Sequence, residues 1–274
     1  NSHGVSMGAN TVVSGTLTLA DGLLSINDKD IQVENISGGS QSSYIQTNSV
    51  YDAVSPGYIK MNVGSSEVCF PVGTSGSYTP CYITNTYVPE SVREFSVRVF
   101  SGVYLDGLYG APFTGDDASL MLDRTWEITP TIETNIDAIV KIQWNGDNEG
   151  SAFDHVSAYL AKNRHLPEDN DWMPLLSVLS GVGPFQLSAE DITTFSTVSG
   201  GSGSSPLPIE LLDFNAVLLQ NKVDISWVTA TEKNNDYFTV ERSSDGVYFE
   251  TIAIVNGAGE SNEVLNYKVF DKDP

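Results

Sequence analysis

Basic residues are scarce in this 274-residue sequence: 13 Lys or Arg stand against 35 Asp or Glu, for a formal net charge of −22. A chain this acidic repels nucleic-acid phosphates and anionic membrane surfaces, so neither is an expected partner. Acidic loops suit Ca²⁺, although a solvated acidic coat explains the same composition. The charge therefore suits a secreted protein. We expect that it requires no cofactor, and Ca²⁺ is the one ion that we consider a candidate ligand.

Long apolar runs are also missing. No stretch reaches the roughly 18 apolar residues that a membrane-spanning helix needs, so no transmembrane segment is expected. Residues 1–4 have neither the basic nor the apolar region of a signal peptide, and residues 271–274 lack the turn signals of a finished domain. We expect the chain to be a piece of a longer exported protein.

Cysteine and histidine are rare, with two and three residues, and their spacing matches no zinc pattern. Cys69 and Cys81 flank a Gly- and Ser-containing turn, which could place them opposite each other on two strands. A disulfide there would be worth about 2–3 kcal/mol in an oxidising compartment. We predict this disulfide; two separately buried thiols are the alternative.

No segment has a helical hydrophobic period over three turns, whereas short alternating runs are common. In residues 11–33 such runs follow one another closely, with Gly, Asn and Asp at the breaks. Strands this short and this close are typical of β-solenoid rungs or of a tight meander. Residues 1–66 are therefore predicted to be β-solenoid-like.

Residues 67–198 are predicted to form a β-sandwich. Segments 67–72 and 78–85 resemble a hairpin, and residues 94–100 alternate so that Phe95, Val97 and Val99 share one face. Further strands at similar spacing indicate two packed sheets. The fold class is thus all-β throughout.

Residues 199–206, rich in Gly and Ser, are predicted to be a linker. Residues 207–274 contain five predicted strands, at 211–217, 222–229, 237–243, 249–255 and 265–271. The second alternates so that Trp227 faces a core. A second sandwich domain is expected here.

The ordered motifs of residues 207–274 carry a family resemblance. They are LPIELLDF (207–214), VDISWVTATE (223–232), NNDYFTVERSSDG (234–246), GAG (257–259) and Asn266-Tyr267. This segment resembles the fibronectin type III-like module near the C-termini of Bacteroidetes surface proteins. The segments FPVGT (70–74), YTP (78–80), RTWEI (124–128), QW (143–144) and TFS (194–196) resemble the region before it. The resemblance implies type IX secretion, contact with the secretion machinery, and attachment to or release from the cell surface.

Two departures from that family matter. The sorting domain that usually follows the module is absent, and five strands are present where the family has seven. Either the chain is truncated, or the missing strands come from elsewhere. A neighbouring chain that donates a strand would cover the unpaired edges and would build a filament.

Catalytic patterns are absent from the sequence. No Gly-x-Ser-x-Gly elbow follows a strand, and Asp154-His155 point to opposite faces if they lie in a strand. With so many acidic residues, a pair at glycosidase spacing carries no information. We therefore expect a protein that is not an enzyme.

Two groups of residues are candidate sites. Oxygen-rich loops could bind Ca²⁺, although neither matches an EF-hand and a solvated turn is the alternative. Exposed aromatic side chains could stack on sugars, whereas Trp126, Trp144 and Trp227 are expected in the core. The metal candidates are Asp147, Asn148, Glu149, Glu168, Asp169 and Asp171, and the ligand-binding candidates are Trp172, Tyr104 and Tyr109.

Taken together, these features predict an extracellular structural or adhesive segment of a secreted bacterial surface protein. Its expected partners are surface polysaccharide or other copies of itself, the latter building a fibre. The alternative is a carbohydrate-binding or spacer module of a secreted polysaccharide hydrolase. An exposed aromatic row on one sheet face would favour that alternative.

Overall fold

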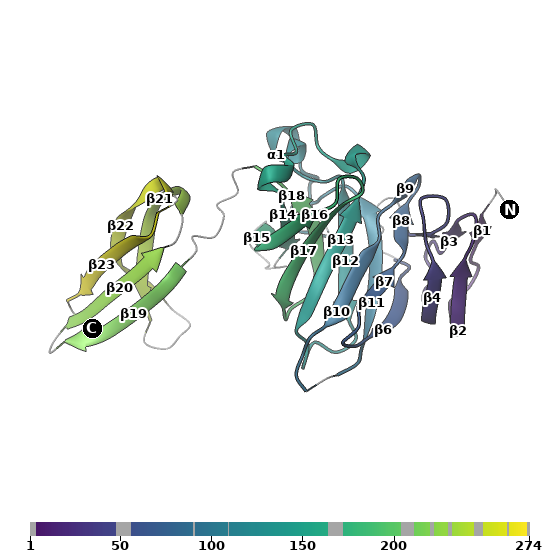
Figure 1. Cartoon of the computed structure of the whole chain (residues 1–274), viewed down its shortest axis with the longest axis horizontal. Coiled ribbons are helices and arrows are strands. Elements are labelled where there is room, and N and C mark those ends of the chain that lie inside the picture. Colours follow the sequence, from purple (N-terminus) through teal and green to yellow (C-terminus); the bar gives the residue numbers. More distant parts are fainter. Residues whose placement is uncertain are drawn as a thin grey trace. The chain divides into compact units, whose positions relative to one another are not determined.

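The structure, a computed structural model, describes residues 4–47, 56–89, 91–108, 110–163, 172–203, 211–219, 222–229, 232–243, 249–261 and 263–272. The chain divides into two compact units, unit 1 (Asn1–Gly203) and unit 2 (Ser204–Pro274). Strands dominate both units, and the one α-helix in the described ranges is the short α1 (Gly115–Ser119) (Figure 1). The all-β prediction is confirmed. None of the described helices is long and apolar enough to cross a membrane.

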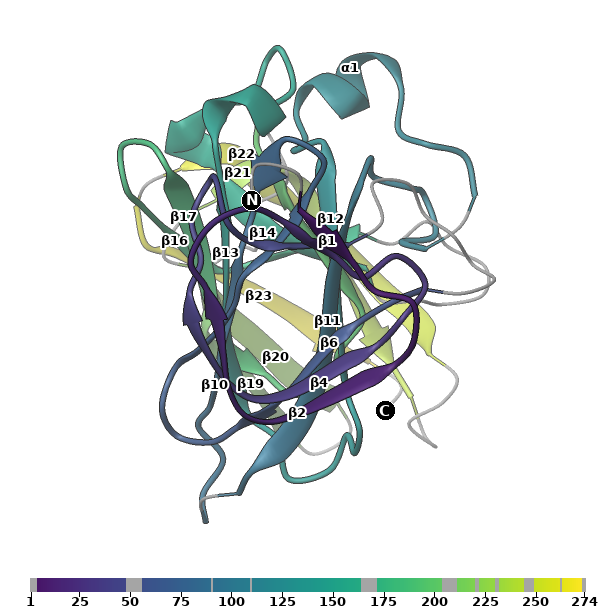
Figure 2. The ribbon, with the colours of Figure 1, turned by 90° about the vertical axis from the view of Figure 1, so that its right-hand side faces the viewer.

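Unit 1 begins with parallel rungs. In one ladder, Val5, Leu24, Ile45 and Val72 stand in register across four short strands, so that apolar side chains stack on apolar side chains. The strands of a meander pair antiparallel, so the parallel pairing observed here favours solenoid-like rungs over a meander. Figure 2 views unit 1 from its N-terminal side, with the first rungs in front. The rung strands are β1 (Val5–Ser6), β3 (Leu24–Ser25), β5 (Ile45–Gln46) and β8 (Val72–Thr74) in one sheet, and β2 (Thr11–Leu19), β4 (Ile31–Gly38) and β6 (Ile59–Val63) in the other.

The rungs continue directly into the sandwich. Strand β6 pairs parallel with β4 on one side and antiparallel with β11 (Arg93–Ser101) on the other. The resulting eight-stranded sheet has the order β15-β14-β18-β12-β11-β6-β4-β2. The predicted boundary between residues 66 and 67 therefore does not separate two units. The remaining strands of this sheet are β12 (Arg124–Pro130), β14 (Tyr159–Asn163), β15 (Trp172–Leu175) and β18 (Thr197–Gly201).

A second, five-stranded sheet faces the first, in the order β16-β17-β13-β10-β7. The core lies between them, and Phe95, Val97 and Val99 of β11 are fully buried there, as their alternation predicts. Trp126 and Trp144 are also fully buried, which confirms the expectation that they are core residues. The strands of this sheet are β7 (Val68–Phe70), β10 (Cys81–Asn85), β13 (Ala138–Trp144), β16 (Ser177–Ser180) and β17 (Phe185–Ile192), and the short β9 (Ser77–Tyr78) forms a hairpin with β8.

The predicted disulfide is wrong, because Cys69 and Cys81 are free thiols. Strands β7 and β10 do pair antiparallel, but Cys81 stands opposite Phe70 and Cys69 stands opposite Tyr82. Directly opposite residues share a face and successive residues alternate, so the two thiols project from opposite faces of the sheet. Side chains that point apart in this way cannot form a disulfide.

The predicted linker also begins too early. Residues 199–201 are the end of β18 and are buried, with Ser199 Oγ donating to the carbonyl of Arg124 at 2.8 Å. At Gly200 and Gly201 a Cβ would lie 2.5 Å from Leu122 and 2.7 Å from Tyr159. These glycines therefore permit close packing rather than flexibility. Residues 204–206 of the predicted linker lie outside the described ranges.

Unit 2 contains the five predicted strands in two sheets. One has the order β19-β20-β23 and the other is the pair β21-β22. Trp227 is 2% exposed and lies 5.4 Å from Tyr267 and 5.2 Å from Phe238, ring to ring, which confirms its predicted core position. The strands are β19 (Leu211–Leu219), β20 (Lys222–Thr229), β21 (Glu232–Arg242), β22 (Glu250–Ser261) and β23 (Leu265–Asp271).

Candidate functional site

A groove of about 530 Å³ lies beside the first rungs of unit 1, and we call it the rung groove. Part of its lining follows from the register of the parallel strands. Ser6, Ser25 and Gln46 stand in register on β1, β3 and β5, each one residue after a member of the apolar ladder. Ser25 Oγ lies 3.2 Å from Gln46 Oε1, and Ser6 Oγ accepts from Asn27 Nδ2 at 2.7 Å. The groove is thus lined by hydroxyl and amide groups that are already oriented by one another.

One wall of the rung groove is fixed by Gln41. Its Nε2 donates to the carbonyl of Gly76 at 3.1 Å, and its Oε1 accepts from Asn145 Nδ2 at 3.2 Å. Tyr44 also lines the groove but is only 1% exposed, and its hydroxyl donates to the carbonyl of Thr74 at 2.6 Å. Asp21 adds an exposed carboxylate to the lining. The groove therefore offers hydrogen-bond donors and acceptors to a polar ligand.

Sequence reasoning missed this groove, because its polar residues are common turn and strand residues. Only the in-register parallel stacking brings residues about 20 positions apart into one surface. The spacing of the short apolar runs predicts that the strands stack, but it does not predict which residues line a groove.

The first acidic turn does not form the predicted cation site. Asn148 is 3% exposed, and its Oδ1 accepts from Ser77 Oγ at 3.0 Å and from the Asn145 backbone at 3.3 Å. Glu149 accepts from two side chains described below, and Asp147 is exposed. Within the described residues no three His, Cys, Asp or Glu side chains are placed to hold a metal ion. The other three candidates, Glu168, Asp169 and Asp171, lie outside the described residues.

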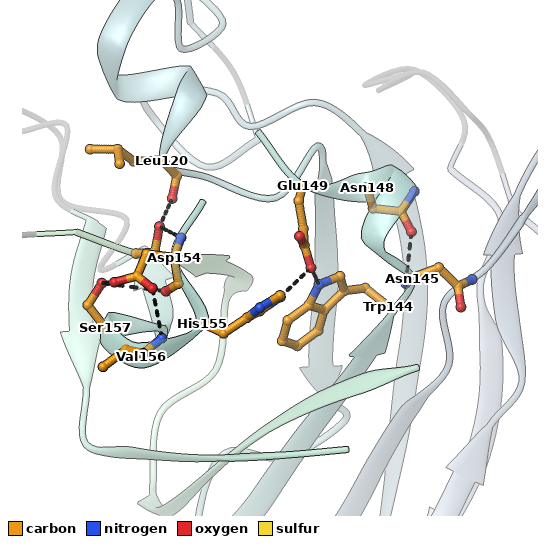
Figure 3. A network of polar contacts seen from close by, with 10 residues as sticks. Leu120, Trp144, Asn145, Asn148, Glu149, Asp154, His155, Val156 and Ser157 are labelled. Carbon is orange, nitrogen blue, oxygen red and sulfur yellow. Dashed lines mark hydrogen bonds and ion pairs between the residues drawn. The ribbon is translucent and has the colours of Figure 1, made fainter. Parts of the chain in front are cut away.

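Glu149 instead bridges the side chains of Trp144 and His155 (Figure 3). Its Oε1 accepts from Trp144 Nε1 at 2.8 Å and lies 2.8 Å from His155 Nε2. The His155 ring stacks on Phe185 with a centroid distance of 4.0 Å. This arrangement holds the loop between β13 and β14 against the core, so His155 has a structural role.

Asp154 and His155 have different hydrogen-bond partners. The Asp154 carboxylate accepts from the Val156 backbone at 3.0 Å and from Ser157 Oγ at 2.9 Å, which caps the 3₁₀ turn η2 (His155–Ser157) (Figure 3). The Val156 backbone hydrogen bond is the main reason that the pKa of Asp154 is lowered. No hydrogen bond between Asp154 and His155 orients the imidazole, as a catalytic dyad would need.

The structure brings two of the three predicted ligand-binding aromatic residues together. Trp172 Nε1 donates to the carbonyl of Tyr104 at 2.8 Å, and Trp172 packs on a small cluster with Val103 and Met121. Both aromatic residues are half-buried. They fasten the loop after β11 to the sheet and do not form an open stacking platform. Tyr109 lies outside the described residues.

Strands β11 and β12 also carry a buried ion pair that the sequence did not reveal. Arg98 Nε and Glu127 Oε2 are 2.5 Å apart on neighbouring strands, and Tyr58 donates to Glu127 Oε1 at 2.9 Å. The Arg98 guanidinium also lies 5.1 Å from the centroid of the Phe100 ring. Burial and the Glu127 charge raise the pKa of Tyr58 well above its usual range. The pair depends on the β11–β12 register, which alternation alone cannot give.

Comparisons with known proteins gave no match to the chain, whether to a protein-family model, a curated protein or a solved structure.

Proposed function

We propose that this chain is an extracellular structural and adhesive segment of a secreted bacterial surface protein, and that the rung groove binds surface polysaccharide. The observation that carries the proposal is the groove itself, in which the in-register strands β1, β3 and β5 of one compact unit place the polar side chains of Ser6, Ser25 and Gln46 side by side. Sites on strands hold their geometry better than sites on loops. Export and surface location follow from the resemblance of residues 207–274 to the fibronectin type III-like modules of Bacteroidetes surface proteins.

The continuous sheet supports a structural role. Strand β6 links parallel rungs to an antiparallel sandwich, so a pull on the rungs is shared by hydrogen bonds along the eight-stranded sheet. The net charge of −22 keeps such a segment soluble outside the cell.

The alternative, a carbohydrate-binding module of a hydrolase, would use an aromatic stacking platform. Among the described residues that line the rung groove, Tyr44 is the one aromatic residue, and it is 1% exposed. Recognition by hydrogen bonds without stacking fits weak, multivalent attachment better than tight binding of a single chain.

Adhesion of protein-coated beads to immobilised bacterial surface polysaccharide tests the proposal. Ser42 is exposed on the rung groove, so Ser42→Trp should obstruct the groove and reduce bead attachment strongly. Thr18→Trp, on an exposed position of β2 that does not line the groove, is the matched control and should attach like the unmodified chain. Equal attachment of the two variants, or no attachment of the unmodified chain, would refute the proposed ligand.

A further inference from the structure

The rung groove crosses three successive rungs of unit 1. Apart from Gly76, its lining falls into three short segments of the chain, at residues 4–6, 21–25 and 41–46, one from each rung. The strands β1, β3 and β5 in these segments lie side by side and pair parallel. The groove therefore extends along the direction in which the rungs stack, across the strands rather than along one of them.

One polar side chain from each rung forms a row in this direction. Ser6, Ser25 and Gln46 stand in register, Ser6 exposed and the other two half-buried. At the fourth rung the residue paired with Gln46 is Gly73, where an added Cβ atom would lie 2.5 Å from the ring of Tyr44. The Tyr44 ring thus occupies the place of a fourth polar side chain, and the row ends there.

The strand ladder fixes the spacing of this row. Neighbouring strands of a sheet lie about 4.7–4.9 Å apart, so a polar group recurs at that distance along the groove. One sugar ring adds about the same length to an extended polysaccharide chain, and hence one sugar can face each rung. Serine hydroxyl and glutamine amide groups both donate and accept hydrogen bonds, as sugar hydroxyls do.

Charge restricts the class of polysaccharide. No Lys, Arg or His is among the described residues that line the groove, and Asp21 contributes a carboxylate to the lining. A carboxylated or sulfated chain would therefore meet like charge without a cation to offset it, on a protein whose net charge is −22. The groove suits a chain that carries no acidic groups.

We propose that the rung groove binds an uncharged, extended polysaccharide chain that lies along the stack, with successive sugars on successive rungs. This inference rests on the proposed function and adds to it the charge of the ligand and its direction in the groove. Ser6, Ser25 and Gln46 are then specificity-determining residues, because each faces a different sugar of the same chain.

The test of charge uses the full chain and three pairs of immobilised polysaccharides. The pairs are hydroxyethylcellulose and carboxymethylcellulose, methyl-esterified and free polygalacturonan, and galactan and sulfated galactan. We expect at least one uncharged polymer to bind, and its acidic partner to bind about tenfold more weakly or less. An acidic polymer that binds as well as its uncharged partner would overturn the inference and leave the proposed function standing. Binding of none of the six polymers would refute the proposed function itself.

The test of direction uses oligosaccharides of the uncharged polymer that binds, as inhibitors of attachment. A trisaccharide should inhibit better than a disaccharide, because it reaches all three rungs. Ser25→Ala, in the middle of the row, should weaken both inhibitors about three- to tenfold through one lost hydrogen bond. Ser6→Ala, at the end of the row, should weaken the trisaccharide and spare the disaccharide, which can occupy the other two rungs.

Ser37→Ala, on an exposed position of β4 outside the groove lining, is the matched control and should change neither inhibitor. Equal inhibition by the two oligosaccharides, or an equal effect of Ser6→Ala on both, would show that the chain does not lie along the stack. That result would overturn the proposed direction without touching the attachment of the polymer.

Discussion

Units 1 and 2 use strands of similar composition but differ in how completely they bury them. In unit 1 the core face of β11 is closed, with Phe95, Val97 and Val99 fully buried between two sheets. In unit 2 the core face of β19 is open, and Phe214 and Leu218 remain more than half exposed. The alternation of a strand thus defines its apolar face, whereas the packing of neighbouring strands determines whether that face is buried.

The polar groups differ between the two units in the same way. The Arg98–Glu127 pair of unit 1 is buried and is supported by a hydrogen bond from Tyr58. The ion pair between Arg242 and Glu250 in unit 2 is exposed to solvent. Desolvation makes a broken buried pair costly, whereas water replaces a lost partner at an exposed pair.

The largest expected effect comes from breaking the buried Arg98–Glu127 pair. Glu127→Ala leaves the Arg98 charge buried without its carboxylate and should lower the free energy of unfolding of unit 1 by about 3–5 kcal/mol. Glu250→Ala in unit 2 is the counterpart and should produce no measurable change. Urea unfolding, with hydrogen exchange and mass spectrometry reporting each unit separately, measures both. Equal losses would mean that the two ion pairs are not in different environments.

Loss of the indole N–H group of Trp126 or of Trp227 should change the free energy of unfolding by an intermediate amount. Trp126 Nε1 donates to the carbonyl of Thr79 at 2.9 Å, so Trp126→Phe should cost about 1–3 kcal/mol through a lost hydrogen bond and a small cavity. Trp227→Phe removes a donor that has no acceptor in the described residues, so its cost should be smaller by about 1 kcal/mol. The same urea experiment compares them, and a larger loss for Trp227→Phe would contradict the open core of unit 2.

The thiols of unit 1 provide a smaller, pH-dependent effect. Burial raises the pKa of Cys69 to about 11 from 9.0, and burial also raises the pKa of Cys81. The thiols of the folded chain keep their protons to higher pH than those of the unfolded chain. Their contribution to the free energy of unfolding is therefore complete below pH 9 and falls as the pH rises from 9 to 11. Cys69→Ser should reduce this fall in stability measured by urea unfolding across that range.

Alkylation with iodoacetamide gives a second reading of the thiols. Both should react slowly in the native chain at pH 8 and rapidly in urea, since the thiolate is the reactive form. A pair that resists alkylation in urea but reacts after reduction would show that a disulfide exists after all.

Calcium should produce the smallest effect. Asn148 and Glu149 are committed to neighbouring protein groups, so added Ca²⁺ should leave the thermal unfolding of unit 1 unchanged. Asp147→Asn should not alter that result. A rise in the melting temperature that Asp147→Asn removes would restore the predicted cation site.

Much of the fold could be predicted from local alternation. The faces of β11 and β20 followed from a period of two, and the closely spaced runs of residues 11–33 predicted stacked rungs. These features depend on one strand at a time, and burial of the apolar face then follows from the hydrophobic effect.

Features that depend on register between strands could not be predicted. A shift of one residue separates the expected Cys69–Cys81 disulfide from the observed opposite faces. The same dependence hid the Arg98–Glu127 pair and the polar ladder of the rung groove. Gly200 and Gly201 resemble linker residues in the sequence, because glycine occurs both in flexible chain and where backbones pack closely, and only the neighbouring side chains distinguish the two.

Native-state hydrogen exchange of the full chain tests the difference between the two units most directly. The account predicts that amides of β11 and β12 exchange only through global unfolding of unit 1, whereas amides of β19 and β21 exchange orders of magnitude faster through local opening. Protection of β19 and β21 as strong as that of β11 and β12, with no partner present, would contradict an open, incompletely covered unit 2.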